Sequence, residues 1–518
     1  MFLHCLTGKA KFRMVHRAAV LLCLVIVLSG SALAQKRYEP TWESLTAREP
    51  APWLLDAKFG IYAHWGIYSV PAYRSEWYAK RMYDKNDSVY KHHVKTYGDP
   101  SKFGNKDFIP MFKAEKYDPN EWADLIAASG AKYAGIAVVH HDGFMLWHSK
   151  VNRWNAGNMG PKRDLYGELV RSLRRKPGMK VIATFHHIRT FDWHLPNEKK
   201  ARDEAQKAGC DLFDPKYADL YWNQYTGKYE DFIAEWKAKV REVIDKYQPD
   251  ILWFDGGKFQ DADSQHHVTE LLSYYFNRAE QWGSQVEVLN KLPMRGGFNF
   301  PRDFGVLTFE EGRDRPAVLE RPWIDDQPIS NDSWCYIQGQ TYKSASEILH
   351  GLIDRVSRGG GLLLSLCPKA DGTINAQQQQ VLLSMGQWLT QNGQAIYGTR
   401  PWKIHAEGPV DKLQYERRGH SRWRFKNCNA EDIRFTCKEN TLYAITLGRP
   451  NGNKLSIKTL GTGTHLSSEG IDDVSLLGSN VRLRWWRNAE ALIIELPTKL
   501  PNDIALAFAI RVKGTLEK

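Results

Sequence analysis

Hydrophobic and polar positions form two kinds of segment between residues 50 and 395. Short apolar runs, rich in β-branched and aromatic residues and bounded by Gly, Pro or Asp, predict buried strands. Longer segments such as 118–130 and 229–247 have apolar residues at helical spacing. The predicted strands are 59–65, 133–140, 181–187, 251–255, 286–290, 304–310 and 361–366. Strands that alternate with helices pair in parallel, so the pattern predicts an α/β fold with a TIM-like (β/α)8 barrel.

The pattern changes near residue 400. Several of the short runs that follow alternate between apolar and polar positions, as half-buried strands do, and Gly, Asn or Pro separates them. The predicted strands are 442–448, 455–461, 474–479, 481–487, 491–497 and 504–512. We therefore expect a catalytic barrel over residues 35–398 and a C-terminal β-sandwich over 399–518.

The first 34 residues have the pattern of a signal peptide. A basic stretch precedes the apolar run "AAVLLCLVIVL", and Ala32-Leu33-Ala34 forms an A-x-A cleavage pattern. The apolar run is too short for a membrane-spanning helix. We expect the mature chain to begin near Gln35 and to be exported to the periplasm or the medium, without a membrane anchor.

Charge and cysteine content narrow the function only slightly. The net charge is +12, and without the four basic residues of the signal it is +8, which suits an anionic partner such as a sulfated glycan. No basic run suggests nucleic acid. The five cysteines outside the signal include no C-x-x-C pair, so neither a zinc site nor a disulfide framework is indicated, although Cys428 and Cys437 are candidates for a bridge.

Titratable residues stand at the ends of the predicted strands. In such a barrel, the carboxyl ends of the strands carry the active site. An Asp after a strand is also a common turn former, and His-rich strand ends can hold a metal. Adjacent ligands on one strand point to opposite faces, so we expect no metal, and no phosphate loop or dinucleotide fingerprint implies another cofactor. The strand-end residues are His64, His140, His141, His186, His187, Asp255 and Glu310.

Carboxylates surrounded by Trp and His are typical of glycoside hydrolysis. One carboxylate attacks the sugar or activates water, and a second carboxyl group protonates the leaving oxygen. Aromatic faces and His or Glu side chains hold the sugar ring and its hydroxyls.

Four long blocks resemble the retaining α-L-fucosidases, glycoside hydrolase family twenty-nine. They are "KFGIYAHWGIYSVPAYRSEWYAKRMY" (58–83), "YAGIAVVHHDGFMLWHSKVNRWNA" (133–156), "PDILWFDGG" (249–257) and the segment 356–402, which begins "VSRGGGLLLSLCPKADG". The resemblance implies that Asp255 is the nucleophile. It also implies sugar binding by His64, Glu76, Trp77, His140 and His141, and Trp253 points the same way as Asp255 because side chains alternate along a strand.

The chain departs from the family pattern at three places in the expected pocket. Ile324 stands where many members have the Glu of a Trp-Glu acid/base, so the acid must come from elsewhere. Glu310 at the end of an apolar strand is the leading candidate, because partial burial raises the pKa of a carboxyl group. Lys291 stands near a usual Arg, and His186 lies in a stretch that is commonly rich in Tyr. The alternative acid/base residues are Glu311, Asp325 and Asp326.

We therefore expect an exo-acting retaining hydrolase that releases terminal α-L-fucose from oligo- or polysaccharides. Two alternatives remain open. One is a hydrolase of another terminal α-linked sugar, such as an α-D-galactoside or anhydrogalactoside of a sulfated algal polysaccharide. The other is a catalytically inactive glycan-binding relative.

Overall fold

The computed structural model describes residues 37–259, 261–291, 297–312, 321–409, 415–417, 423–425, 428–464, 466–467 and 469–517. The expected signal peptide, residues 1–34, lies outside these ranges. Within them, no helix combines the length and the apolar character that a bilayer span requires.

Eight parallel strands close into a barrel, in the order in which they occur along the chain. Its interior is filled by side chains such as Tyr133, Ile182, Ile251, Leu289 and Leu363. This confirms the predicted (β/α)8 class. The strands are β1 (Phe59–Ala63), β2 (Tyr133–Val139), β3 (Lys180–Phe185), β4 (Ile251–Phe254), β5 (Glu287–Lys291), β6 (Val306–Glu310), β7 (Trp323–Pro328) and β8 (Gly360–Leu366).

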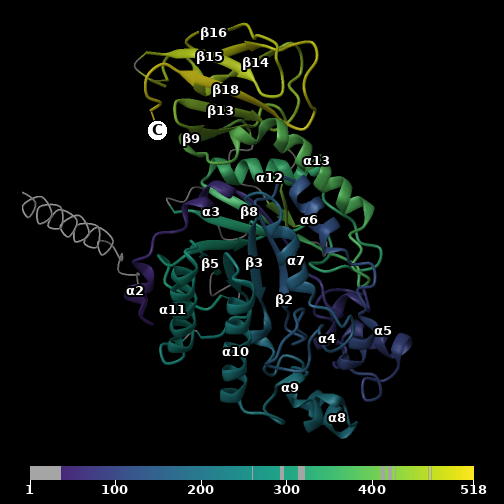
Figure 1. Ribbon diagram of the computed structural model, residues 1–518. Helices are drawn as coiled ribbons and strands as arrows, with labels where there is room; N and C mark the ends of the chain where they lie inside the picture. Colours follow the sequence, from purple (N-terminus) through teal and green to yellow (C-terminus); the bar gives the residue numbers. More distant parts are fainter. Residues whose placement is uncertain are drawn as a thin grey trace, which may run out of the picture.

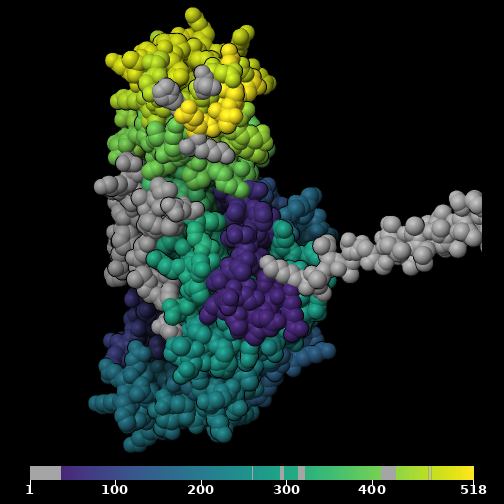
Figure 2. Space-filling model, turned by 90° about the vertical axis from the view of Figure 1, so that its left-hand side faces the viewer, coloured from purple at the N-terminus to yellow at the C-terminus, as the bar shows by residue number. Residues whose placement is uncertain are grey.

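Helices cover the outside of the barrel (Figure 1). The longer ones are α6 (Pro119–Ala128), α7 (Leu165–Arg174), α10 (Tyr229–Tyr247), α11 (Gln265–Trp282), α12 (Ala345–Ser357) and α13 (Ala376–Asn392). The shorter ones are α2 (Trp42–Thr46), α3 (Pro52–Ala57), α4 (Tyr78–Arg81), α5 (Ser88–Tyr97), α8 (Lys199–Lys207) and α9 (Ala218–Tyr221). The segment that contains α2 lies against α11, and the carbonyl of Tyr38 accepts hydrogen bonds from Ser273 and Asn277 (Figure 2).

The C-terminal domain is a β-sandwich, as predicted. Five strands form one sheet and three form the other, and apolar side chains of both sheets share one core. The five-stranded sheet contains β9 (Arg400–Glu407), β12 (Ile433–Lys438), β13 (Thr441–Thr446), β15 (Ile471–Leu476) and β18 (Leu506–Val512). The three-stranded sheet contains β14 (Lys454–Ile457), β16 (Trp485–Arg487) and β17 (Leu492–Glu495), and β10 (Tyr415–Arg417) pairs separately with β11 (Trp423–Phe425).

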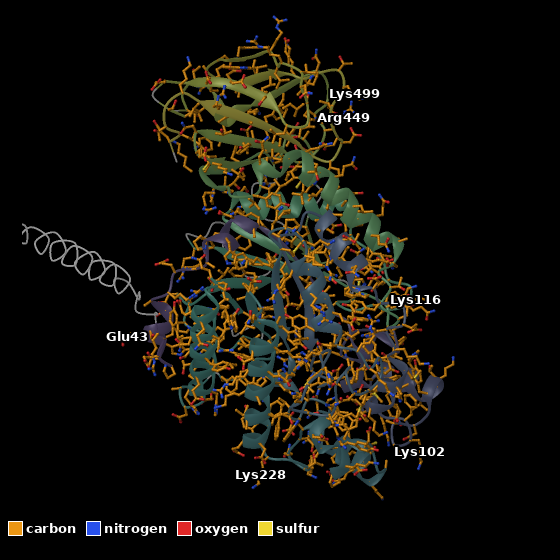
Figure 3. All side chains as sticks on the ribbon, viewed as in Figure 1. Glu43, Lys102, Lys116, Lys228, Arg449 and Lys499 are labelled. Atoms are coloured by element: carbon orange, nitrogen blue, oxygen red, sulfur yellow. The ribbon has the colours of Figure 1, made fainter. Side chains whose placement is uncertain are left out.

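Two helices of the barrel carry this domain. The Trp388 indole of α13 donates to the carbonyl of Ala505, and Arg434 of β12 contacts Asp354 of α12 at 2.6 Å. Charged side chains, six of which are labelled in Figure 3, lie at the outer surface of both domains.

One candidate bond is not formed, and one strand was missed. No disulfide joins Cys428 and Cys437, and the Cys437 thiol points from β12 toward the carbonyl of Pro401. The strand β7 was not predicted, because Asp325, Asp326 and Gln327 make its sequence polar although all six of its residues are buried.

Candidate active site

A cavity of about 160 Å³ opens at the carboxyl ends of the barrel strands. Three of its histidines directly follow β1, β2 and β3, the aspartate follows β4, and the lysine and the glutamate are the last residues of β5 and β6. The closed parallel barrel thus brings together side chains that are far apart in the sequence: the Tyr62 hydroxyl donates to Asp326 Oδ2 at 3.2 Å, across 264 positions. The lining residues are Tyr62, His64, Glu76, Trp77, His140, His141, His186, Arg189, Trp253, Asp255, Lys291, Glu310, Asp326 and Trp334.

The end of β4 explains why a buried strand delivers an aspartate. Ile251 to Phe254 are all buried, and the indole of Trp253 donates to Thr308 Oγ1 inside the barrel at 3.3 Å. Gly256 has a φ of 146°, and a Cβ there would lie 2.1 Å from Ile188 Cγ2, so only glycine fits this turn. The strand therefore stops abruptly and leaves Asp255 facing the cavity.

Lys291 joins the two carboxylates that the sequence assigns to catalysis. Its Nζ lies 2.8 Å from Asp255 Oδ2 and 3.1 Å from Glu310 Oε2. Because one nitrogen makes both contacts, these two oxygens lie at most 5.9 Å apart, the combined length of the contacts. Retaining glycosidases hold their carboxyl groups about 5–5.5 Å apart, and inverting enzymes about 6.5–9.5 Å.

Lys291 stays cationic in this position. Burial alone lowers the pKa of its ammonium, but the carboxylates of Asp255 and Glu310 raise the pKa further than burial lowers it, so the result lies above the ordinary value. The lysine side chain is 4% exposed, whereas those of Asp255 and Glu310 are 19% and 17% exposed. The two carboxylates are therefore open to a substrate, and the lysine is held beneath them.

Three histidines of the cavity, His140, His141 and His186, are neutral hydrogen-bonding groups. Burial, followed by neighbouring imidazoles and cations, lowers the pKa of His140, His141 and His186 well below 6.5. A hydrogen bond of 2.6 Å joins His141 Nδ1 to the carbonyl of His186, and one of 2.9 Å joins His64 Nδ1 to Ser365 Oγ. A neutral imidazole can donate from one nitrogen and accept at the other, which suits sugar hydroxyls.

Three of these imidazoles also approach the spacing of a metal site. The ligand nitrogens of His64, His140 and His186 lie within 4.8 Å of one another. A zinc ion would need a fourth ligand besides these three imidazoles. The carboxylate of Asp255 is nearby, with Oδ2 4.0 Å from His186 Nε2, but it already pairs with Lys291. The arrangement suits a polar organic substrate better than a cation.

The alternative acid/base residues lie in different surroundings. Asp325 points away from the cavity to Arg355 of α12, at 2.5 Å, and both side chains are fully buried. Glu311 does not line the cavity. Asp326 does line it, and the Asp326 residue is 2% exposed. Burial raises the pKa of Asp326 well above its ordinary value, and the Glu310, Asp325 and Asp255 carboxylates raise it further against the effect of Lys291. Ile324, the second residue of β7, does not line this cavity.

All eight predicted sugar-binding residues line the cavity, and three further residues were missed. Tyr62 lies two positions before His64 on the same face of β1, so alternation could have revealed it. Arg189 stacks over the Trp77 ring at 5.5 Å, and Trp334 lies 5.2 Å from the His64 ring. Nothing in the local sequence signals these two: Arg189 ends a short 3₁₀ helix (His187–Arg189) after β3, and Trp334 lies in a loop after β7.

Paired carboxylates, neutral histidines and indoles at the carboxyl end of a TIM-like barrel define a glycoside hydrolase. Residues 25–394 match the family model described as alpha-L-fucosidase, and residues 426–513 match that of the alpha-L-fucosidase C-terminal domain. The chain belongs to the α-L-fucosidase family, as the four sequence blocks indicated.

Relatives and solved structures agree with this assignment. The chain is 30% identical to an alpha-L-fucosidase of Branchiostoma floridae, over 95% of this chain and 100% of the relative. It is 30% identical to the human tissue alpha-L-fucosidase, over 96% and 97%. The crystal structure of Thermotoga maritima alpha-fucosidase in complex with fucose is 31% identical, covers 92% of this chain and 100% of its own, and superposes with a TM-score of 0.71.

Proposed function

We propose that this protein hydrolyses terminal α-L-fucosides of glycans with retention of configuration, with Asp255 as the nucleophile and Glu310 as the acid/base. The observation that carries the proposal is the contact of one ammonium, Lys291, with both carboxylates. It limits the two contacting oxygens to a separation of at most 5.9 Å, which accommodates the spacing of about 5–5.5 Å between the carboxyl groups of retaining enzymes.

In the first step, Asp255 Oδ attacks the anomeric carbon as the bond to the leaving oxygen breaks. Glu310 gives its proton to that oxygen, so the aglycone departs as an alcohol. The sugar remains as an ester on Asp255. Lys291 lies against the attacking carboxylate and orients it.

In the second step, Glu310 takes a proton from water, and the resulting hydroxide equivalent attacks the same carbon. The ester bond to Asp255 breaks, and the free sugar leaves with the configuration of the substrate. Both residues then return to their starting protonation states.

Hydrogen-bond donors and acceptors around the two catalytic carboxylates recognise the sugar. His64, His140 and His141 offer imidazole nitrogens, and Glu76, which accepts from Ser333 Oγ at 3.3 Å, offers a carboxylate. The rings of Trp77 and Trp334 supply apolar surface for a sugar whose C6 carries no hydroxyl. A protonated Asp326 can donate a further hydrogen bond.

The first test is the initial rate on aryl α-L-fucoside and on aryl α-D-galactoside. Turnover of the fucoside, with the α-anomer of fucose as the first product by NMR, supports the proposal. Preference for the galactoside would assign the altered pocket to another sugar, and a β-anomeric first product would contradict retention.

The second test is the Asp255→Gly variant. Loss of turnover and its partial recovery with added azide, which forms a glycosyl azide, support Asp255 as the nucleophile. Activity equal to that of the unaltered protein would contradict it. We further propose export with cleavage after Ala34, which N-terminal sequencing of the exported protein tests.

A further inference from the structure

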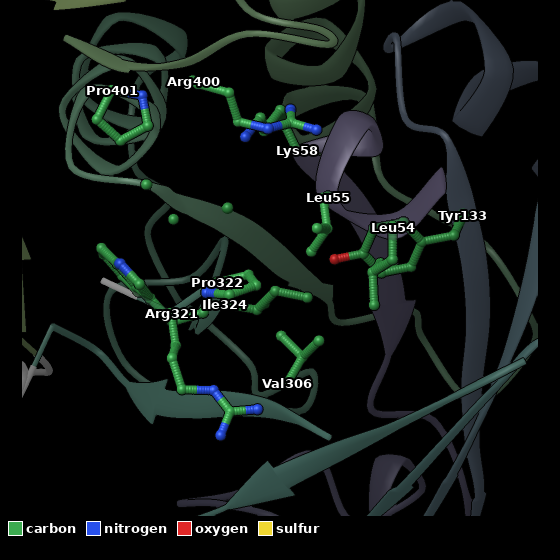
Figure 4. A pocket seen from close by; sticks show the side chains of 14 residues that line it. Leu54, Leu55, Lys58, Tyr133, Val306, Arg321, Pro322, Ile324, Arg400 and Pro401 are labelled. Atoms are coloured by element: carbon green, nitrogen blue, oxygen red, sulfur yellow. The ribbon is translucent and has the colours of Figure 1, made fainter. Parts of the chain in front are cut away.

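A second cavity lies at the opposite end of the barrel from the active site. Its volume is about 210 Å³, several times the roughly 30 Å³ of one water molecule. Its walls come from the residue before β1, the first residues of β2, β6 and β7, and the start of β9 (Figure 4). It therefore lies where the barrel meets the C-terminal domain.

One part of this basal cavity is apolar. The side chains of Leu54, Val306 and Ile324 face it, together with the ring of Tyr133 (Figure 4). Leu54, Val306 and Ile324 are each at most 4% exposed, so their surfaces are shielded from bulk solvent. Such a surface favours an apolar ligand over water.

Among the residues that the structure describes, the charged ones that line the cavity are cations: Lys58, Arg321 and Arg400. Arg400 pairs with Asp56 at 2.8 Å, and the Arg321 guanidinium donates to the carbonyl of Asp303 at 2.7 Å. Both arginines thus have partners outside the cavity.

Lys58 differs from them. It is 6% exposed, and among the described residues its ammonium has no hydrogen bond or ion pair. Burial lowers the pKa of Lys58, and the nearby Arg400 cation lowers it further. The Asp56 carboxylate acts in the opposite direction, and the resulting pKa is about 7. A buried ammonium without an anion is unfavourable, and a ligand anion would remove that penalty.

We propose that the basal cavity binds an amphipathic monoanion, a single carboxylate on a short apolar body. The carboxylate contacts Lys58 and Arg400, and the apolar body packs against Leu54, Val306 and Ile324. Figure 4 shows Lys58 and Arg400 near one end of the cavity and these apolar side chains toward the other. This site is independent of the hydrolytic activity.

The test is isothermal titration with octanoate, with octanol as the neutral probe of the same length. Octanoate is expected to bind at least about tenfold more tightly than octanol, because a charge-assisted contact contributes about 1.5–3 kcal/mol. Lys58→Met and Arg400→Gln should each weaken octanoate binding, and Lys58→Met by at least about tenfold. Lys116→Met, at a side chain that is 69% exposed, is the matched control and should leave binding unchanged.

The pH dependence gives a second measurement. Octanoate affinity should fall by at least about tenfold from about pH 6 to about pH 8.5 as Lys58 loses its proton, whereas Arg400 stays charged. Absent binding, equal affinity for octanol, or unchanged binding in a folded Lys58→Met variant would each overturn the proposal. An octyl sulfate that binds as well as octanoate would support the site and widen the anionic group that it accepts.

Discussion

Lys291 touches two carboxylates that act differently during hydrolysis. Asp255 attacks the sugar, whereas Glu310 must face the leaving oxygen and give it a proton. The Lys291 ammonium contacts Glu310 at 3.1 Å in the free site. Binding of a substrate therefore has to draw Glu310 away from the lysine, while the contact with Asp255 remains.

The variant Lys291→Met tests this role. We expect kcat/KM on an aryl α-L-fucoside to fall by about 10²–10³, because a preorganised cation beside the reacting groups is lost. Lys291→Arg keeps the charge and should lose less. Steady-state rates of both variants decide the question, and a methionine variant as active as the unaltered protein would contradict it.

Glu310 and Asp326 can be separated by the leaving group of the substrate. Glu310→Ala should reduce turnover of a natural fucoside by about 10²–10⁴ but affect an activated aryl fucoside far less, because a good leaving group needs no proton. Asp326→Asn should slow both substrates by similar factors. If Asp326→Asn instead shows the leaving-group dependence, Asp326 is the acid.

The residues of the site were largely predictable, because each apolar strand ends at the same edge of the barrel. Asp255 and Glu310 follow buried runs, and fold and alternation together place them in one cavity. Trp334 and Arg189 were not predictable, since an irregular loop carries the first and a single short 3₁₀ helix carries the second. The role of Lys291 depends on Asp255, 36 positions away, and no local pattern contains that contact.

At the scale of elements, β7 shows where hydrophobic patterning fails. Asp325 and Asp326 are neighbours in a buried strand and face opposite sides. Each burial is tolerated because of partners that are distant in the sequence. Asp325 pairs with Arg355 of α12. Asp326 accepts a hydrogen bond from Tyr62 and lies near the Lys291 cation. The sequence of β7 alone therefore predicts a polar, exposed segment. The strand can be buried only because residues distant in the sequence pair with its two aspartates.

The buried pair of β7 and α12 predicts a stability effect without a direct effect on chemistry. Asp325→Ala should lower the free energy of unfolding by about 3–5 kcal/mol, because the buried Arg355 loses its ion pair with Asp325. Urea unfolding measures the change. Asp472→Ala removes an exposed partner of Arg511 and should cost less than about 1 kcal/mol. Equal effects of the two variants would contradict the argument.

At the scale of the whole molecule, buried histidines make stability depend on pH. Burial, and then the Lys80 cation, lowers the pKa of His194 to about 3 from 6.5. Below pH 6.5 the unfolded chain takes up a proton at this position and the folded chain does not. The free energy of unfolding therefore falls as the pH decreases, by about 2 kcal/mol at pH 5 through His194 alone.

Thermal or urea unfolding at several pH values checks this prediction. His194→Phe, which keeps an aromatic ring between Trp193 and Tyr221, should flatten the pH dependence by that amount. His148→Gln, at an exposed position, should leave it unchanged. An unaltered slope in the His194 variant would show that this histidine takes up its proton equally in the folded and the unfolded protein.

The C-terminal domain sits at the end of the barrel that faces away from the hydrolytic cavity (Figure 1). A bead, a membrane mimic or a fused protein attached at the last residue therefore leaves the catalytic mouth pointing outward. Immobilised in that orientation, the enzyme should process long or branched glycans as readily as in free solution, whereas random attachment through surface lysines should not.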